Sequence, residues 1–139
     1  MTDSRNSAVA ALLLRLSLGT MFIAHALLKY FVFTLPGTAE FFASLGLPGV
    51  LGYMTFAFEL AGGVLLVLGV KTRIVALALV PILLGATWAH FDNGWLFSAP
   101  NGGWEYPAFW TITLLVQALL GDGAYSMRPS PPEPAGQAA

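Results

Sequence analysis

Four long apolar runs, separated by short segments rich in polar residues, glycine and proline, dominate this chain. A membrane-spanning helix needs roughly 20 residues, and these runs predict helices over about 8–33, 50–70, 74–90 and 106–120. An amphipathic segment, 38–49, lies between the first two runs and is too short to span. Such a segment is typical of a piece that lies in the membrane interface or re-enters the helices. The pattern predicts an all-α, integral membrane four-helix bundle over 8–126.

The ends of the chain and its connections are more polar. Residues 1–7 are predicted to be flexible, and 127–139 form a proline-rich tail that is predicted to be disordered. The basic residues outside the apolar runs fall in three segments that share one side if there are four crossings; they are Arg5, Lys71, Arg73 and Arg128. The other two connections carry only acidic charges: Glu40, Asp92 and Glu105. This asymmetry predicts both termini in the cytoplasm of a bacterial-type inner membrane.

Composition narrows the range of functions. Hydrophobic residues make up 57% of the chain and charged residues 9%, which is far too little charge for the surface of a water-soluble protein of 139 residues. The formal net charge is −1 and there is no basic run, so we expect the lipid bilayer and not nucleic acid as a partner. The absence of cysteine excludes disulfides, thiolate catalysis and cysteine-ligated iron–sulfur clusters.

Ionisable residues inside the apolar runs are the best indication of function. Arg15, His25 and Lys29 fall within an arc of about 80° on the first predicted helix, which must face other helices or a wet cavity. Glu59 lies in the middle of the second run, and we expect it to form a structural ion pair with Arg15. The candidate polar site comprises five residues: His25, Lys29, Glu59, His90 and Glu105.

Several interpretations of these residues remain open. The site can bind the polar head of a quinone or a similar amphiphile between aromatic walls, for which the candidates are Phe22, Phe31, Trp88 and Trp104. Ligation of a haem by His25 and His90 is a weaker interpretation because no spacing motif supports it, and no other metal site is expected. In the structural alternatives, the Arg15–Glu59 pair only locks two helices together, and Lys29 only extends to the interface. His90 and Glu105 would then be ordinary residues at helix ends.

The order of the short motifs resembles that of the DoxX family of small four-helix membrane proteins. The motifs that carry the resemblance run from about residue 12 to 127: Arg15-Leu16-Ser17-Leu18-Gly19 followed by Phe22, His25 and Lys29; Phe41-Phe42-Ala43-Ser44-Leu45-Gly46-Leu47-Pro48; Glu59-Leu60-Ala61-Gly62-Gly63; Leu68-Gly69-Val70-Lys71-Thr72-Arg73; Asn101-Gly102-Gly103-Trp104-Glu105-Tyr106; and Gly121-Asp122-Gly123-Ala124-Tyr125-Ser126. Ala26 departs from the glycine that many members carry after the histidine.

The resemblance implies a role in membrane redox chemistry. The family is similar to the membrane subunit of thiosulfate:quinone oxidoreductase, so the leading hypothesis is an inner-membrane subunit of a redox complex that contacts quinone. The alternatives are a non-enzymatic accessory or scaffold subunit and, with less support, a small-molecule carrier. The chain has no dinucleotide fingerprint or flavin motif. Redox partner proteins or a bound quinone would therefore have to hold the electrons, and whether the chain is itself an enzyme stays open.

Overall fold

The computed structural model describes residues 2–132, and every regular element in this range is a helix. The helices are α1 (Thr2–Phe31), α2 (Leu35–Ser44), α3 (Val50–Leu68), α4 (Thr72–Ala89), the short 3₁₀ helix η1 (Phe91–Asn93) and α5 (Glu105–Leu120). The four long helices agree closely with the four apolar runs. The all-helical prediction is therefore confirmed.

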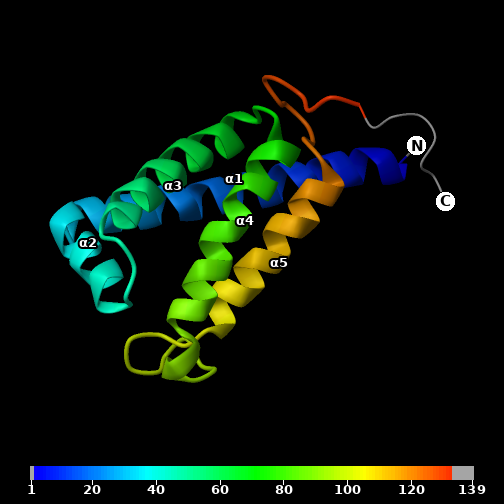
Figure 1. Ribbon diagram of the computed structural model, residues 1–139. Helices are drawn as coiled ribbons and strands as arrows, with labels where there is room; N and C mark the ends of the chain where they lie inside the picture. The colour runs from blue at the N-terminus through cyan, green and yellow to red at the C-terminus, as the bar shows by residue number, and fades with distance from the viewer. Residues whose placement is uncertain (1, 133–139) are drawn as a thin grey trace.

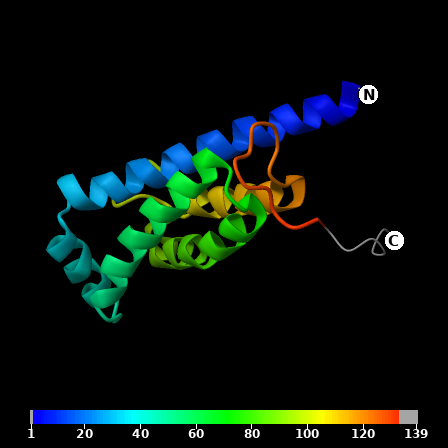
Figure 2. The same cartoon turned by 90° about the horizontal axis from the view of Figure 1, so that it is seen from above.

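Helices α1 and α3 form one closely packed pair, and α4 and α5 form another (Figure 1). Two glycines allow the first pair to approach closely: a Cβ atom on Gly19 would lie 2.7 Å from the carbonyl oxygen of Gly63, and one on Gly63 would lie 2.8 Å from the carbonyl oxygen of Gly19. Such small residues are typical of helix contacts in membranes. The two pairs lie close together near the chain termini and diverge toward α2 and the loop 91–104 (Figures 1 and 2).

An apolar core layer holds the two pairs together. All four long helices contribute to it, and its largest buried members are Leu18, Phe22, Leu66, Leu79, Leu83, Trp110 and Leu114. Along α1 the layer lies between Arg15 and His25, and along α5 it extends from Trp110 to Ala118. The core therefore separates two polar regions, one near the termini and one near the loop 91–104.

Within residues 2–132, three helices are long and apolar enough to cross a membrane: α1, α3 and α4. Their outward faces carry large apolar side chains, such as Leu13 at 60% exposure and Leu77 at 53%, which suits contact with lipid. Helix α5 has 16 residues and exposes Phe109 and Ile112 in the same way. Its crossing, and the cytoplasmic location of both termini, stay predictions.

Helix α2 occupies most of the predicted amphipathic segment but begins three residues earlier, at Leu35. Thr34 caps it by accepting a hydrogen bond from the backbone N–H of Gly37 (3.2 Å), and Pro36 stands in the first turn, where its missing N–H has no partner to lose. The helix packs against α3, where Gly52 lies directly against Ala39. Pro36 thus lies after the end of α1 and in the first turn of α2.

Both ends of the described chain are more ordered than predicted. Residues 2–7, expected to be flexible, form the first turns of α1. Residues 127–130, assigned to the disordered tail, belong to a C-terminal strap (residues 121–130) that binds the backbones of α1, α3 and the turn before α4. Its bonds are Ala124 N–H to Ala8 O (3.0 Å), Met127 N–H to Leu68 O (3.1 Å), Arg128 N–H to Gly69 O (3.1 Å) and Lys71 N–H to Arg128 O (2.7 Å). The rest of the predicted tail, 133–139, lies outside the described residues.

Candidate functional site

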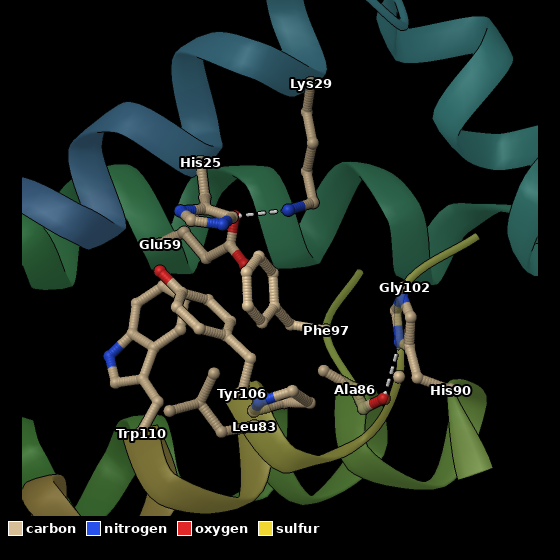
Figure 3. Close-up of a pocket in the computed structure, with 12 residues that line it drawn as sticks. His25, Lys29, Glu59, Leu83, Ala86, His90, Phe97, Gly102, Tyr106 and Trp110 are labelled. Carbon is tan, nitrogen blue, oxygen red and sulfur yellow. Dashed lines mark hydrogen bonds and ion pairs between the residues drawn. The ribbon is translucent and has the colours of Figure 1, made fainter. Parts of the chain in front are cut away.

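A cavity of about 320 Å³ opens between the two diverging helix pairs. Figure 3 shows its lining side chains, which come from all four long helices and the loop 91–104: His25, Lys29, Glu59, Leu83, Ala86, His90, Phe97, Gly102, Gly103, Tyr106, Pro107 and Trp110. Four of the five residues of the predicted polar site therefore meet around one space. The fifth, Glu105, does not line it.

An ion pair forms one wall of the cavity. The Nζ atom of Lys29 lies 2.8 Å from Oε2 of Glu59, and the two side chains are 18% and 6% exposed. The pair joins α1 to α3 within an otherwise apolar contact. Each charge neutralises the other, so both groups can stay ionised beside a ligand. Either charge alone would raise the free energy of the folded protein at this apolar position.

The prediction that Glu59 pairs with Arg15 is wrong, because Lys29 forms the ion pair with Glu59. Gly19 lies opposite Gly63 in the antiparallel α1–α3 contact, so Glu59 lies about two turns, or roughly 12 Å, from the level of Arg15. Side chains on a helix also point back toward its N-terminus. Lys29 therefore extends toward Glu59, while Arg15 extends away from it.

Arg15 instead lies near the chain termini and is 1% exposed. Its Nη2 donates to the carbonyl oxygen of Ala124 in the C-terminal strap (3.1 Å), and its guanidinium packs against the backbone of Gly69 at the end of α3. The carboxylate of Asp122 adds a favourable electrostatic interaction. Arg15 therefore joins α1 to the strap and does not take part in the cavity.

Asp122 organises the strap itself. Its Oδ1 accepts from the backbone N–H of Thr72 (3.0 Å) and the hydroxyl of Ser130 (3.0 Å), and its Oδ2 accepts from the backbone N–H of Ser130 (2.8 Å). Burial would raise the pKa of Asp122, but these hydrogen bonds outweigh burial and hold the pKa below its ordinary value. The carboxylate is thus a structural group that fixes the strap to the start of α4.

The two histidines are held in the same way on different helices. Nδ1 of His25 lies 2.9 Å from the carbonyl oxygen of Met21, and Nδ1 of His90 lies 2.8 Å from the carbonyl oxygen of Ala86, one turn earlier in each case. The His25 ring also packs against Trp110, with ring centroids 4.8 Å apart. Both imidazoles are therefore oriented before any ligand arrives.

Glu105 positions the loop instead of lining the cavity. Its Oε1 accepts from the backbone N–H of Phe97 (3.0 Å), and its own N–H donates to the carbonyl oxygen of Trp95 (3.1 Å). These bonds hold the loop 91–104 against the start of α5 and bring Phe97 to the cavity (Figure 3).

The four aromatic residues expected as walls are not among the lining side chains. Phe22 is fully buried under the cavity, where it packs on Trp110 with ring centroids 4.6 Å apart. Phe31 and Trp88 are 72% and 57% exposed, because each stands two residues, or about 200° of helix rotation, from a residue that lines the cavity. Trp104 packs against Trp95 within the loop.

Sequence reasoning missed the aromatic residues that do line the cavity: Phe97, Tyr106 and Trp110. Tyr106 and Trp110 are one turn apart, so they share a face of α5. That spacing could have predicted that both residues line the same space. No pattern in the sequence could have placed Phe97, because its position depends on how the loop folds.

Comparison with known proteins supports the resemblance. The model of the DoxX family matches residues 10–92. This chain belongs to the DoxX family. It is also 40% identical, over 83 residues, to "Putative oxidoreductase CatD" of Bacillus subtilis (strain 168), an alignment that covers 60% of this chain and 60% of that protein. No solved structure gives a significant match.

The family match covers only part of the site. Residues 10–92 of this DoxX protein include four polar residues of the cavity, namely His25, Lys29, Glu59 and His90. Phe97, Tyr106 and Trp110 lie beyond the matched residues, so the family model does not extend to the loop and α5 side of the cavity. The motifs quoted from 101–126 are likewise outside it.

Apolar helices and family membership together identify a multi-pass membrane protein. Within the described residues, no group of three or more His, Cys, Asp or Glu side chains comes together as a metal site would require.

Proposed function

We propose that this protein is the membrane subunit of a redox complex and that its cavity binds the head group of a quinone. The observation that carries the proposal is the convergence of His25, Lys29, Glu59 and His90 on one cavity between the helix pairs. Polar groups in a largely apolar, aromatic-lined space are typical of sites for small amphiphilic molecules. The oxidoreductase description of the similar Bacillus protein points to the same kind of chemistry.

The residues present fit such a head group. Lys29 and the hydroxyl of Tyr106 can donate hydrogen bonds to quinone oxygens, while the imidazoles and Glu59 can accept from their reduced forms. Trp110 and Phe97 offer flat apolar surfaces for the ring. A volume of about 320 Å³ lies at the small end of ligand sites, so the head group would occupy the cavity and its apolar tail would extend into lipid.

A bound quinone would supply the electron-carrying chemistry, and this chain would bind and orient it. Because the sequence contains no dinucleotide or flavin motif, the proposal requires a partner protein as the electron donor or acceptor. The competing proposal is an accessory subunit that anchors such a partner and binds no quinone.

Binding of a short-chain quinone to the protein in lipid nanodiscs tests the proposal directly. We expect Tyr106→Phe to weaken quinone binding by about tenfold, because it removes a donor to the quinone oxygens, and Glu59→Gln and His25→Ala to weaken binding of the quinol by a similar factor, because each removes an acceptor of its hydroxyl hydrogens. Glu40 lies on α2 and is exposed, so Glu40→Gln is a matched control that should bind like the wild type.

The opposite result is equally informative. If the folded wild-type protein binds neither redox form, or if Tyr106→Phe and Glu59→Gln bind both forms as well as Glu40→Gln does, the cavity is not the quinone site. Co-purification of a stable partner complex without quinone would then favour the anchoring role.

A further inference from the structure

The hydrogen bonds of the two histidines determine which ring nitrogen carries the proton. A carbonyl oxygen can only accept, so Nδ1 of His25 must donate to Met21, and Nδ1 of His90 must donate to Ala86. In a neutral imidazole, the other nitrogen is then unprotonated. Nε2 of each histidine is therefore a hydrogen-bond acceptor.

Both histidines line the cavity, on different walls. His25 comes from α1 and lies beside Glu59, whereas His90 comes from the end of α4 and lies beside Gly102 (Figure 3). Glu59 supplies a third acceptor, because Lys29 bonds only its Oε2 and leaves Oε1 for a ligand. Acceptors thus face the cavity from both helix pairs.

Donors are present as well, and Nε1 of Trp110 is buried without a hydrogen-bond partner. Lys29 retains two N–H groups after its bond to Glu59, and the hydroxyl of Tyr106 can donate or accept. A ligand carbonyl can accept from these two residues, but it can only oppose its lone pairs to those of a histidine Nε2. A ligand hydroxyl can accept from Lys29 and also donate to Nε2 or to Glu59.

We propose, building on the quinone site proposed above, that the cavity binds the dihydroxy form of its ligand, the quinol, in preference to the quinone. The quinol satisfies both the donors and the acceptors of the cavity, whereas the quinone leaves the acceptors unpaired in an apolar surrounding. An unpaired buried acceptor is costly. The site therefore discriminates by redox state before any electron is transferred.

The test compares three ligands by calorimetry on the whole protein in nanodiscs, at about pH 8, where an ordinary histidine is neutral. The ligands are a short-chain benzoquinone, its quinol kept reduced without oxygen, and the dimethyl ether of that quinol. We expect the quinol to bind about tenfold more tightly than the quinone, the effect of one additional hydrogen bond. The ether, which has no hydroxyl hydrogen, should bind no better than the quinone.

Two variants locate the preference. Glutamine can turn its NH₂ group toward the ligand, so His25→Gln and His90→Gln should each reduce the ratio of quinol to quinone affinity toward one without abolishing quinone binding. Glu40→Gln should leave the ratio unchanged. If one histidine variant does not fold, the other variant and the ether on the wild-type protein still decide the question.

The possible failures are distinguishable. Equal binding of quinol and quinone, or tighter binding of the quinone, overturns this inference and leaves the quinone site intact. Binding of the ether as tight as that of the quinol also overturns it. If neither redox form binds, the proposed function itself is wrong, and this inference with it.

Discussion

The two ends of the molecule hold their buried charges in different ways. Near the termini, Nη2 of Arg15 donates to a backbone carbonyl while its Nε and Nη1 are buried without a hydrogen-bond partner, and Asp122 accepts two backbone N–H groups and a hydroxyl; neither residue lines the cavity. Near the loop 91–104, Lys29 and Glu59 bond each other and border an open space. The first arrangement joins segments of the chain that are distant in sequence. The second leaves hydrogen-bonding capacity for a molecule that is not part of the chain.

This difference separates a structural charge from a candidate functional charge in one small protein. Arg15 lies inside an apolar run, as Lys29 and Glu59 do, so the presence of a charge there does not distinguish the two kinds. What distinguishes them is whether the charged group contacts only the folded chain or also borders the cavity. Substitutions at one end at a time therefore separate the two kinds of charge.

The largest effect is expected from breaking the ion pair. Lys29→Met leaves the carboxylate of Glu59, 6% exposed, without its partner, and removal of one member of a buried pair costs about 3–5 kcal/mol. The double variant Lys29→Met/Glu59→Leu should recover most of that stability but not quinone binding. Thermal unfolding followed by tryptophan fluorescence measures the first, and calorimetry the second. If the double variant still binds quinone, the pair has no role in the site.

The strap should be the next most sensitive element. Asp122→Asn replaces a charged acceptor of three hydrogen bonds, so we expect a loss of about 2 kcal/mol with little change in quinone binding. Because the pKa of Asp122 is lowered in the folded protein, its contribution is complete above the ordinary aspartate range and disappears as the pH falls through that lowered pKa. The difference in Tm between wild type and variant should therefore shrink only in acid. A difference that is constant with pH would contradict this role.

A smaller effect should follow from filling the close contact between α1 and α3. Gly19→Ala introduces a Cβ atom 2.7 Å from both the Gly63 carbonyl and a methyl of Val67, which should cost about 1–2 kcal/mol and shift the wall that carries Lys29. Gly85→Ala is the matched control, since nothing lies within 4 Å of its Cβ and it should stabilise α4 by about 0.5–1 kcal/mol. Equal effects of the two substitutions on Tm would show that the helix contact is not tight.

The smallest effect is expected in the loop. Glu105→Ala removes the acceptor of the Phe97 N–H, which should cost about 0.5–1 kcal/mol and increase proteolysis or hydrogen exchange within the loop 91–104. Glu40→Ala, on exposed α2, is the control. Unchanged hydrogen exchange at Phe97 would show that Glu105 does not hold the loop.

Much of the fold could be predicted because apolar length and helix stops are local properties of the sequence. Pro36, Gly69 and the glycine-rich loop 91–104 mark where the helices are interrupted. Most ends of the long helices therefore lie within a few residues of the predicted positions. The strap could not be predicted in this way, because Arg128 and Ser130 form hydrogen bonds with the backbone of residues more than fifty positions earlier. A polar, proline-rich composition is compatible with disorder until such partners are known.

The candidate site was predictable in its residues but not in its pairing. His25, Lys29, Glu59 and His90 could be selected because ionisable side chains are costly in apolar helices. The partner of Glu59 depended on the register of two helices, which Gly19 and Gly63 set by contact across the interface. The direction in which helical side chains point then decided between Lys29 and Arg15.

The apolar core layer has a consequence for membrane energetics. Between the cavity and the level of Arg15, the four long helices carry no Asp, Glu, His, Lys or Tyr, so no titratable side chain links one polar region to the other. A proton taken up or released in the cavity must exchange with the compartment that the loop 91–104 faces. Protons taken up or released at this site would then pass through that compartment and not across the core layer.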